Sequence, residues 1–263
     1  MTALVGTTGR ITLNWLYAGA QVCVLMLETL RWIFIEPLRG RGMRVRSVVE
    51  HFVEFGVRSL PIVGMICFLI GAIMAMQAAY TLQKWGATRL IANLVGVSAL
   101  RELAPLMTAI LITGRCGAAI TAEIGTMKVA EEIDALEVMG LNPTKFLVVP
   151  KFLAMLLAVP CVTVLAMFIM IAGGYMVSVY FIHVDAQIYL DQTALALEGR
   201  DLVTGLVKSF FFAIVICWVG VYRGFQVEGG AEGVGNRTTA SVVTSIFLII
   251  VVDMIWTALF YFG

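Results

Sequence analysis

The chain has 263 residues, of which 60% are hydrophobic and 13% are charged, and its formal net charge is +1. A soluble domain carries about 25% charged residues, so this composition excludes a soluble globular protein and indicates an integral membrane protein. The small net charge gives no indication of a nucleic-acid partner, and we expect none.

The first 46 residues differ from the rest of the chain and are predicted to form an N-terminal unit of their own. Residues 11–35 are apolar apart from four polar residues on one helical stripe, which are Asn14, Gln21, Glu28 and Arg31. We expect an amphipathic helix in the cytoplasmic interface of the membrane, with a transmembrane helix as the competing interpretation. Residues 38–58 carry five arginines, a basic cluster typical of the cytoplasmic side.

Residues 47–263 contain five apolar stretches, each long enough to cross about 30 Å of hydrocarbon as a helix. We expect the polar segments 183–201 and 223–237 to be loops. The predicted fold is all-α, with five transmembrane helices, an N-terminal interfacial helix and a cytoplasmic connecting helix. The five predicted spans cover residues 61–82, 89–113, 147–182, 202–222 and 238–262.

The distribution of lysine and arginine predicts the orientation of these spans. Both residue types are frequent in segments 39–58, 114–151 and 223–237 and sparse in segments 83–89 and 183–201. Positively charged connections remain on the cytoplasmic side of a membrane. We therefore expect the N-terminus inside the cell and the C-terminus outside.

The far end of the first predicted span carries four residues with two possible roles. Met74 and Gln77 fall on one helical face, which Trp85 continues, and methionine adapts to varied acyl chains. One interpretation is a lipid pocket near the outer end of the span. The other is ordinary helix packing with an aromatic belt at the interface. The candidate pocket residues are Met74, Gln77, Tyr80 and Trp85.

Four charged residues are predicted to lie within the membrane, namely Arg101, Glu102, Lys208 and Asp253. Pro105 lacks an N–H and clashes with the carbonyl of Arg101, so we expect the helix to kink or open there. Charges in a membrane cost about 2.5–3.5 kcal/mol each on insertion scales and therefore face protein or water. The Arg101–Glu102 pair is either a polar lock in a substrate path or part of a fixed ion pair with one of the other two charges.

Residues 114–127 place small residues one helical turn apart, a pattern that allows two helix backbones to approach closely. Charged residues are interspersed among the small ones. The segment is predicted to form a close helix contact. Its candidate residues are Gly114, Arg115, Gly117, Glu123 and Gly125.

Residues 128–141 are predicted to form a short amphipathic helix with stop signals at Gly140 and Pro143. The segment is too polar to span a membrane, and it connects two spans on the cytoplasmic side. It is either a docking element for a partner protein or an ordinary interfacial linker. The candidate docking residues are Glu131, Glu132, Asp134, Glu137 and Gly140.

Cysteine and histidine give no basis for a metal site. The five cysteines are scattered, and the two histidines, His51 and His183, are far apart in the sequence. We expect no metal, no cofactor and no catalytic residue. The sequence has no G-x-x-x-x-G-K-[ST] motif, so we expect no ATP hydrolysis through a P-loop in this chain.

Four motifs occur in sequence order, namely LRELAP at 100–105, GRCGAAITAEIGTM at 114–127, EEIDALEVMGLNP at 131–143 and VVPK at 148–151. They resemble the MlaE/YrbE family, which comprises permease subunits of ABC-type phospholipid transporters of the Mla kind. The resemblance extends from about Ser47 to the C-terminus. Ala104 and Cys116 depart from it, because the family often has Gly and Ala at these positions.

The resemblance implies a homodimeric, multi-pass permease of the inner membrane with a periplasmic C-terminus. It further implies cytoplasmic ABC ATPase subunits docked on the 128–141 helix, an MCE-domain partner on the outer side, and phospholipid as the substrate passing between the two copies.

Two other functions remain open from the residues alone. One is a proton-coupled secondary transporter that uses Glu102, although the chain has few spans and no internal repeat. The other is a membrane scaffold that transports nothing, although a scaffold has little use for charges in the middle of its spans.

Overall fold

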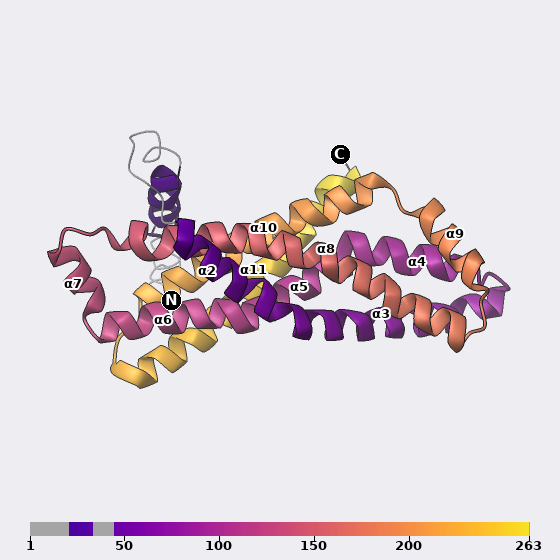
Figure 1. The fold of residues 1–263 in the computed structure, drawn as a ribbon, viewed down its shortest axis with the longest axis horizontal. Helices are drawn as coiled ribbons and strands as arrows, with labels where there is room; N and C mark the ends of the chain where they lie inside the picture. The colour runs from indigo at the N-terminus through magenta and orange to yellow at the C-terminus, as the bar shows by residue number, and fades with distance from the viewer. Residues whose placement is uncertain (1–20, 34–44, 263) are drawn as a thin grey trace, which may run out of the picture.

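The computed structural model describes residues 21–33 and 45–262, and every regular element within these ranges is helical. Five helical rods in this part of the chain are long and apolar enough to cross a membrane, which confirms the predicted all-α membrane fold. The rods lie roughly side by side along the long axis of the molecule (Figure 1). The short helix α7 (Glu132–Val138) lies at one end and α9 (Ala186–Ala196) at the other, and we call these the α7 end and the α9 end.

The first two rods are longer than predicted. The second rod is continuous, so the small-residue segment 114–127 belongs to it. The first rod joins α2 (Val45–Phe55), the 3-10 turn η1 (Val57–Ser59), α3 (Leu60–Leu82) and the 3-10 turn η2 (Gln83–Trp85). The second joins α4 (Leu90–Ser98), the π-helical turn η3 (Ala99–Leu103), α5 (Ala104–Ile112), the π-helical turn η4 (Thr113–Gly117) and α6 (Ala118–Val129).

The other three rods are built on single long helices. The third begins with the π-helical turn η5 (Thr144–Val148) and continues as α8 (Val149–Tyr180), which remains one helix across Pro160, as expected. The fourth and fifth are α10 (Gly199–Phe225) and α11 (Gly230–Phe262). Helix α10 is largely buried by its neighbours, whereas α11 has only three buried residues, Ser241, Ser245 and Ile249.

The prediction of a loop at 183–201 is wrong, because this segment contains α9. Asp185 caps the helix, and its Oδ1 accepts hydrogen bonds from the amides of Gln187 (2.9 Å) and Ile188 (3.1 Å). Tyr189 is buried beside Gly174 of α8. Burial raises the pKa of the Tyr189 hydroxyl to about 12. A cap and one buried face thus fold a segment whose polar composition alone suggested a loop.

The prediction of a loop at 223–237 is also wrong for most of its length. Helix α10 continues to Phe225 and α11 begins at Gly230, so only residues 226–229 separate them. The chain turns back at Gly229 and Gly230, where φ is +83° and +72°. Glycine adopts this left-handed region without steric conflict, which explains how so short a connection reverses the chain.

Residues 21–33 form a helix that runs across the direction of the long rods at the α7 end (Figure 1). Tyr222 Oη donates to Gln21 Oε1 at 3.2 Å, and Asn142 Nδ2 donates to Glu28 Oε1 at 2.9 Å. A crossing position at one end of the bundle is the position expected of an interfacial helix. Asn14 and the other predicted helical residues before position 21 lie outside the described residues.

Helices α3 and α8 cross with their backbones in contact. A Cβ added to Gly71 would lie 1.9 Å from the carbonyl oxygen of Met170. A Cβ added to Gly173 would lie 2.1 Å from the carbonyl oxygen of Phe68. Small residues at a helix crossing inside a membrane allow this close approach.

We predict that Gly71→Ala lowers the thermal unfolding midpoint of the detergent-purified protein, because the new methyl group collides with backbone that cannot move aside. Overpacking of this kind costs about 1–3 kcal/mol. Gly235→Ala is the matched control, since a Cβ there meets open space. The control should unfold at or slightly above the wild-type temperature. Equal midpoints for Gly71→Ala and wild type would contradict the described crossing.

Candidate functional site

The second rod opens beside the charged pair at its centre. Residues Ala99–Leu103 form a π-helical turn that ends two residues before Pro105, which has no amide hydrogen to donate. Helix α10 packs directly onto this turn, where a Cβ on Gly205 would lie 2.2 Å from the carbonyl oxygen of Leu100. The opening predicted from the proline is therefore present, and α10 contacts its backbone.

Lys208 of α10 lies at the centre of a charge network that joins three elements. Its side chain is fully buried, and Nζ donates to Glu102 Oε2 of η3 at 2.6 Å and to Thr257 Oγ1 of α11 at 2.7 Å. Asp253 Oδ1 lies 3.0 Å from the same Nζ, at an ion-pair distance but without hydrogen-bond alignment. Thr257 Oγ1 is also 3.1 Å from Glu102 Oε1. One ammonium thus faces two carboxylates.

Arg101 has a partner of its own. Its Nε donates to Asp201 Oδ1 near the start of α10, and the Asp201 side chain is buried. Asp201 Oδ2 also accepts a hydrogen bond from the Glu198 amide at 3.1 Å, as part of a capping box. Because adjacent helix positions point about 100° apart, Arg101 and Glu102 bind different partners.

Two cavities open beside the Glu102 carboxylate, which borders both. The first, of about 250 Å³, is lined by polar side chains together with aromatic Phe260 and Tyr261. The second, of about 440 Å³, is more apolar and includes Met254 and Phe262 of α11. A charged wall next to an apolar one fits an amphipathic molecule, because such a molecule presents surfaces of both kinds.

Two members of this site, Asp201 and Thr257, are not among the residues predicted from the sequence. Asp201 fell within the segment taken for a loop, and its signal was the Glu-x-x-Asp spacing of a helix start at Glu198. Thr257 was not considered, although it follows Asp253 by four residues and so lies on the same helical face. Both partners of Lys208 on α11 therefore come from one turn of that helix.

The predicted lipid-pocket residues lie apart from these cavities, on the first rod. Met74 packs against a small apolar cluster that includes Ala75 and Ala78, whereas Gln77 and Tyr80 are exposed. Trp85 is exposed in the turn η2. Their assignment to a lipid pocket stays a prediction.

The predicted docking helix is shorter than residues 128–141, because Lys128 and Val129 belong to α6. Two residues with left-handed backbone conformation flank the helix: Glu131 (φ 57°) precedes α7, and Gly140 (φ 73°) follows it. Ile133 and Leu136 are buried beneath the helix. The exposed face carries Glu131, Glu132, Asp134, Glu137, Val138 and Met139.

The predicted close-packing residues divide between two faces of the second rod. A Cβ on Gly117 or Gly125 would press on α10 or the chain just after it, at 3.2 Å from Ile216 and 2.6 Å from Val227 respectively. Gly114 instead meets open space.

The two charged members of this set contact other rods. Arg115 Nη1 donates to Ser59 Oγ at 2.7 Å. The half-exposed Glu123 pairs with buried Lys151 of α8 at 2.7 Å. Each charge in this segment thus ties the second rod to a neighbour.

Within residues 21–33 and 45–262, no group of three His, Cys, Asp or Glu side chains is arranged to hold a metal ion. The polar site described above is built from ion pairs and hydroxyl contacts alone. Five spans with such a network inside them define a multi-pass membrane protein of the kind that includes channels and transporters.

Comparison with known proteins gives the family. The model of the MlaE permease family matches residues 48–259. A probable ABC transporter permease protein of Rickettsia prowazekii is 36% identical over 88% of this chain and 89% of its own length. A Synechocystis protein of the same description is 35% identical over 88% of each chain. The intermembrane phospholipid transport system permease protein MlaE of Haemophilus influenzae is 32% identical over 81% of this chain and 82% of its own. The chain belongs to the MlaE permease family.

We predict that Lys208→Ala strongly destabilises the protein, because it leaves Glu102 and Asp253 facing each other without a cation. Breaking a buried ion pair in this way typically costs about 3–5 kcal/mol. The measurement is the yield and thermal midpoint of the purified protein. A triple variant, Lys208→Met with Glu102→Gln and Asp253→Asn, should recover most of the loss, because no charge is then left unpaired. Wild-type stability of Lys208→Ala would show that the network does not hold the helices together.

Proposed function

We propose that the chain is the membrane-spanning subunit of an ABC transporter that moves phospholipids between the inner membrane and an outer-facing MCE-domain partner. The observation that carries this proposal is the charge network of Lys208 at the edge of two cavities between helices, in a member of the MlaE permease family. The description of the Haemophilus relative as a phospholipid transport permease supports the substrate class.

We propose that a separate ABC ATPase subunit supplies the energy for transport. The 263 residues contain no P-loop motif. The projecting helix α7 is suited to contact such a subunit, because it presents four carboxylates beside exposed Val138 and Met139. Acidic side chains around these exposed apolar residues are electrostatically complementary to a basic groove on the partner.

A second copy of the chain is proposed to complete the lipid path. Helix α11 presents Val243, Phe247 and Met254, each more than 60% exposed, on a face that few neighbours cover. Met254 also borders the larger cavity beside Glu102, so this cavity opens toward the same face. A symmetric pair joined along α11 would enclose the cavities of both copies, and two-fold pairs are the commonest closed assemblies.

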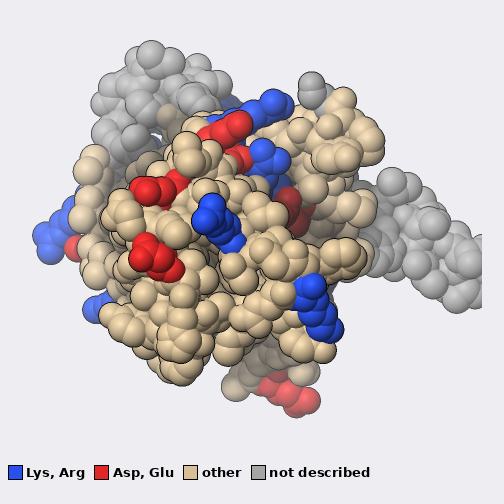
Figure 2. Space-filling model, turned by 90° about the vertical axis from the view of Figure 1, so that its right-hand side faces the viewer, with Lys and Arg blue, Asp and Glu red and all other residues tan. Residues whose placement is uncertain are grey.

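The orientation proposed from the sequence places the α7 end in the cytoplasm. In the described part of the chain that end carries Arg46, Lys128, Lys145, Arg223 and Arg237. The α9 end shows scattered charges of both signs among mostly uncharged residues (Figure 2). Because positively charged termini of spans stay inside, the C-terminus is expected in the periplasm of an inner-membrane protein.

The test is lipid transfer from vesicles that contain the purified permease, with and without its ATPase subunit. Transfer of a fluorescent phospholipid should require both the ATPase and ATP and should persist when the proton gradient is collapsed. Transfer that instead follows the proton gradient without ATP would favour a secondary transporter that uses Glu102 and would overturn the proposal.

The same preparation tests the role of α7. The double substitution Glu131→Lys and Glu132→Lys should abolish ATPase binding, because like charges placed against a basic groove cost several kcal/mol. Asp191→Lys on α9 is the control, since it reverses an exposed acid at the opposite end and should leave ATPase binding unchanged. Normal ATPase binding by the α7 variant would remove the docking role.

A further inference from the structure

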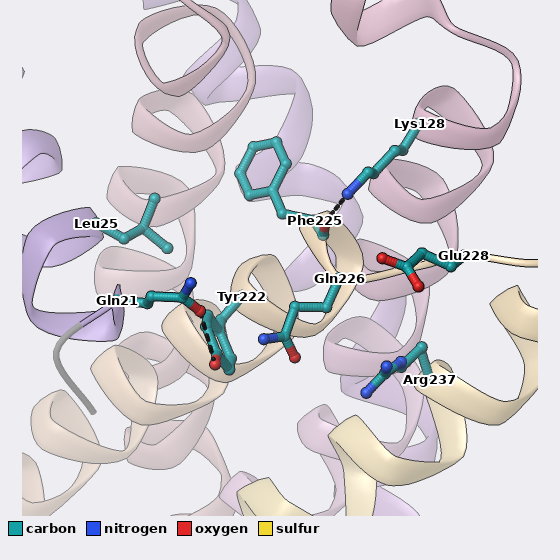
Figure 3. A pocket seen from close by; sticks show the side chains of 8 residues that line it. All are labelled: Gln21, Leu25, Lys128, Tyr222, Phe225, Gln226, Glu228 and Arg237. Carbon is teal, nitrogen blue, oxygen red and sulfur yellow. Dashed lines mark hydrogen bonds between the residues drawn. The ribbon is translucent and has the colours of Figure 1, made fainter. Parts of the chain in front are cut away.

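A separate polar cavity of about 450 Å³ lies at the α7 end of the molecule. None of its lining residues belongs to the charge network of Lys208. It is an open cavity bordered by the helix of residues 21–33, the end of α6, the end of α10 and the first turns of α11 (Figure 3). Its polar lining consists of Gln21, Lys128, Tyr222, Gln226, Glu228 and Arg237.

The residues around the cavity indicate that it lies at the level where the membrane meets water. Tyr222 is close to the end of the apolar part of α10, and Arg223 follows it directly. Arg237 precedes the apolar part of α11. Tyrosine and the first basic residues of a span mark the head-group layer of a bilayer. Gln21 and Leu25 of the crossing helix border the cavity.

The side chains in the cavity provide positive charge that is only partly satisfied. Lys128 Nζ donates to the Phe225 carbonyl, at the C-terminal end of α10. Within the described part of the chain, the half-buried Arg237 guanidinium has neither an ion pair nor a hydrogen bond, and the Glu228 carboxylate likewise has none. Figure 3 shows Lys128 and Arg237 on either side of Glu228.

We propose that this cavity binds the head group of an anionic phospholipid, whose phosphate accepts hydrogen bonds from Lys128 and Arg237. Two cations against one carboxylate leave a net positive site, which favours an anionic lipid over a zwitterionic one. Glu228 can accept hydrogen bonds from head-group hydroxyls, as a glycerol head group would offer. Leu25 and Phe225 supply an apolar edge for the start of the acyl chains.

The bound lipid would join the N-terminal helix to the permease bundle. Among the described residues, one hydrogen bond, from Tyr222 Oη to Gln21 Oε1, bridges the two across this cavity. A phosphate bonded to Lys128 and Arg237, with its acyl chains against Leu25, would add contacts between the same two parts. This role is independent of transport through the Lys208 site, because the two cavities have no lining residue in common.

The test measures lipids retained by the full-length protein after purification in mild detergent. Native mass spectrometry of wild type reconstituted with equal amounts of phosphatidylglycerol and phosphatidylethanolamine should show preferential retention of phosphatidylglycerol. Lys128→Gln with Arg237→Gln should weaken that retention by about a hundredfold, since each of the two charge-assisted hydrogen bonds is worth about tenfold in affinity. Arg46→Gln, which removes an exposed cation outside the cavity, should retain the lipid normally.

A wild-type measurement keeps the test independent of how well the variants fold. Phosphatidylglycerol should raise the thermal midpoint of wild type more than phosphatidylethanolamine does, and inorganic phosphate should not replace it. Equal retention and equal stabilisation by the two lipids would overturn the proposal. Full stabilisation by inorganic phosphate would also overturn it, because the site would then bind a free anion and not a lipid.

Discussion

The structure depends on the burial of one ammonium group inside the membrane. Lys208 has no exposed surface, so its charge must be balanced by groups that other helices bring to it. Glu102 and Asp253 provide the balance, and Thr257 accepts a further hydrogen bond. The second rod, α10 and α11 are therefore required to meet at one depth in the bilayer.

Local backbone chemistry makes this meeting possible. Pro105 removes one helical hydrogen bond, and the rod relaxes into a π-helical turn that carries Glu102. Gly205 lets α10 rest on the carbonyl of Leu100, which brings Lys208, three residues further along, to the carboxylate. A side chain at position 205 would separate the helices by the width of a methyl group and lengthen the ion pair.

The same arrangement leaves a site open to a substrate. Glu102 is part of the network, yet it also borders both cavities, one polar and one largely apolar. Helix α11 contributes to the network on one face and exposes an apolar surface on the other. In our account, the network fixes the wall of a lipid path, and a second copy closes it along α11.

Much of the fold could be predicted from composition and spacing, because hydrocarbon thickness sets the length of a span and a proline disrupts its helix wherever it occurs. The five spans and the opening near Pro105 are examples. The partners of the charges could be predicted only as alternatives, since they depend on how the rods rotate about their axes. Arg101 pairs with Asp201, which looked like a loop residue, and the segment around α9 folds because Tyr189 finds a buried position that its polar neighbours did not reveal.

The central claim, that lipid passes beside the Lys208 network, is tested most directly by photocrosslinking in the assembled transporter. A photoreactive residue at position 261 replaces Tyr261, which borders both cavities. A second one at position 180 replaces Tyr180, another exposed tyrosine, which belongs to α8 and lies outside them. The account predicts lipid adducts at position 261 that decrease when ATP is hydrolysed, and adducts at position 180 that do not change. Adducts at position 261 that are as insensitive to ATP as those at position 180 would contradict it.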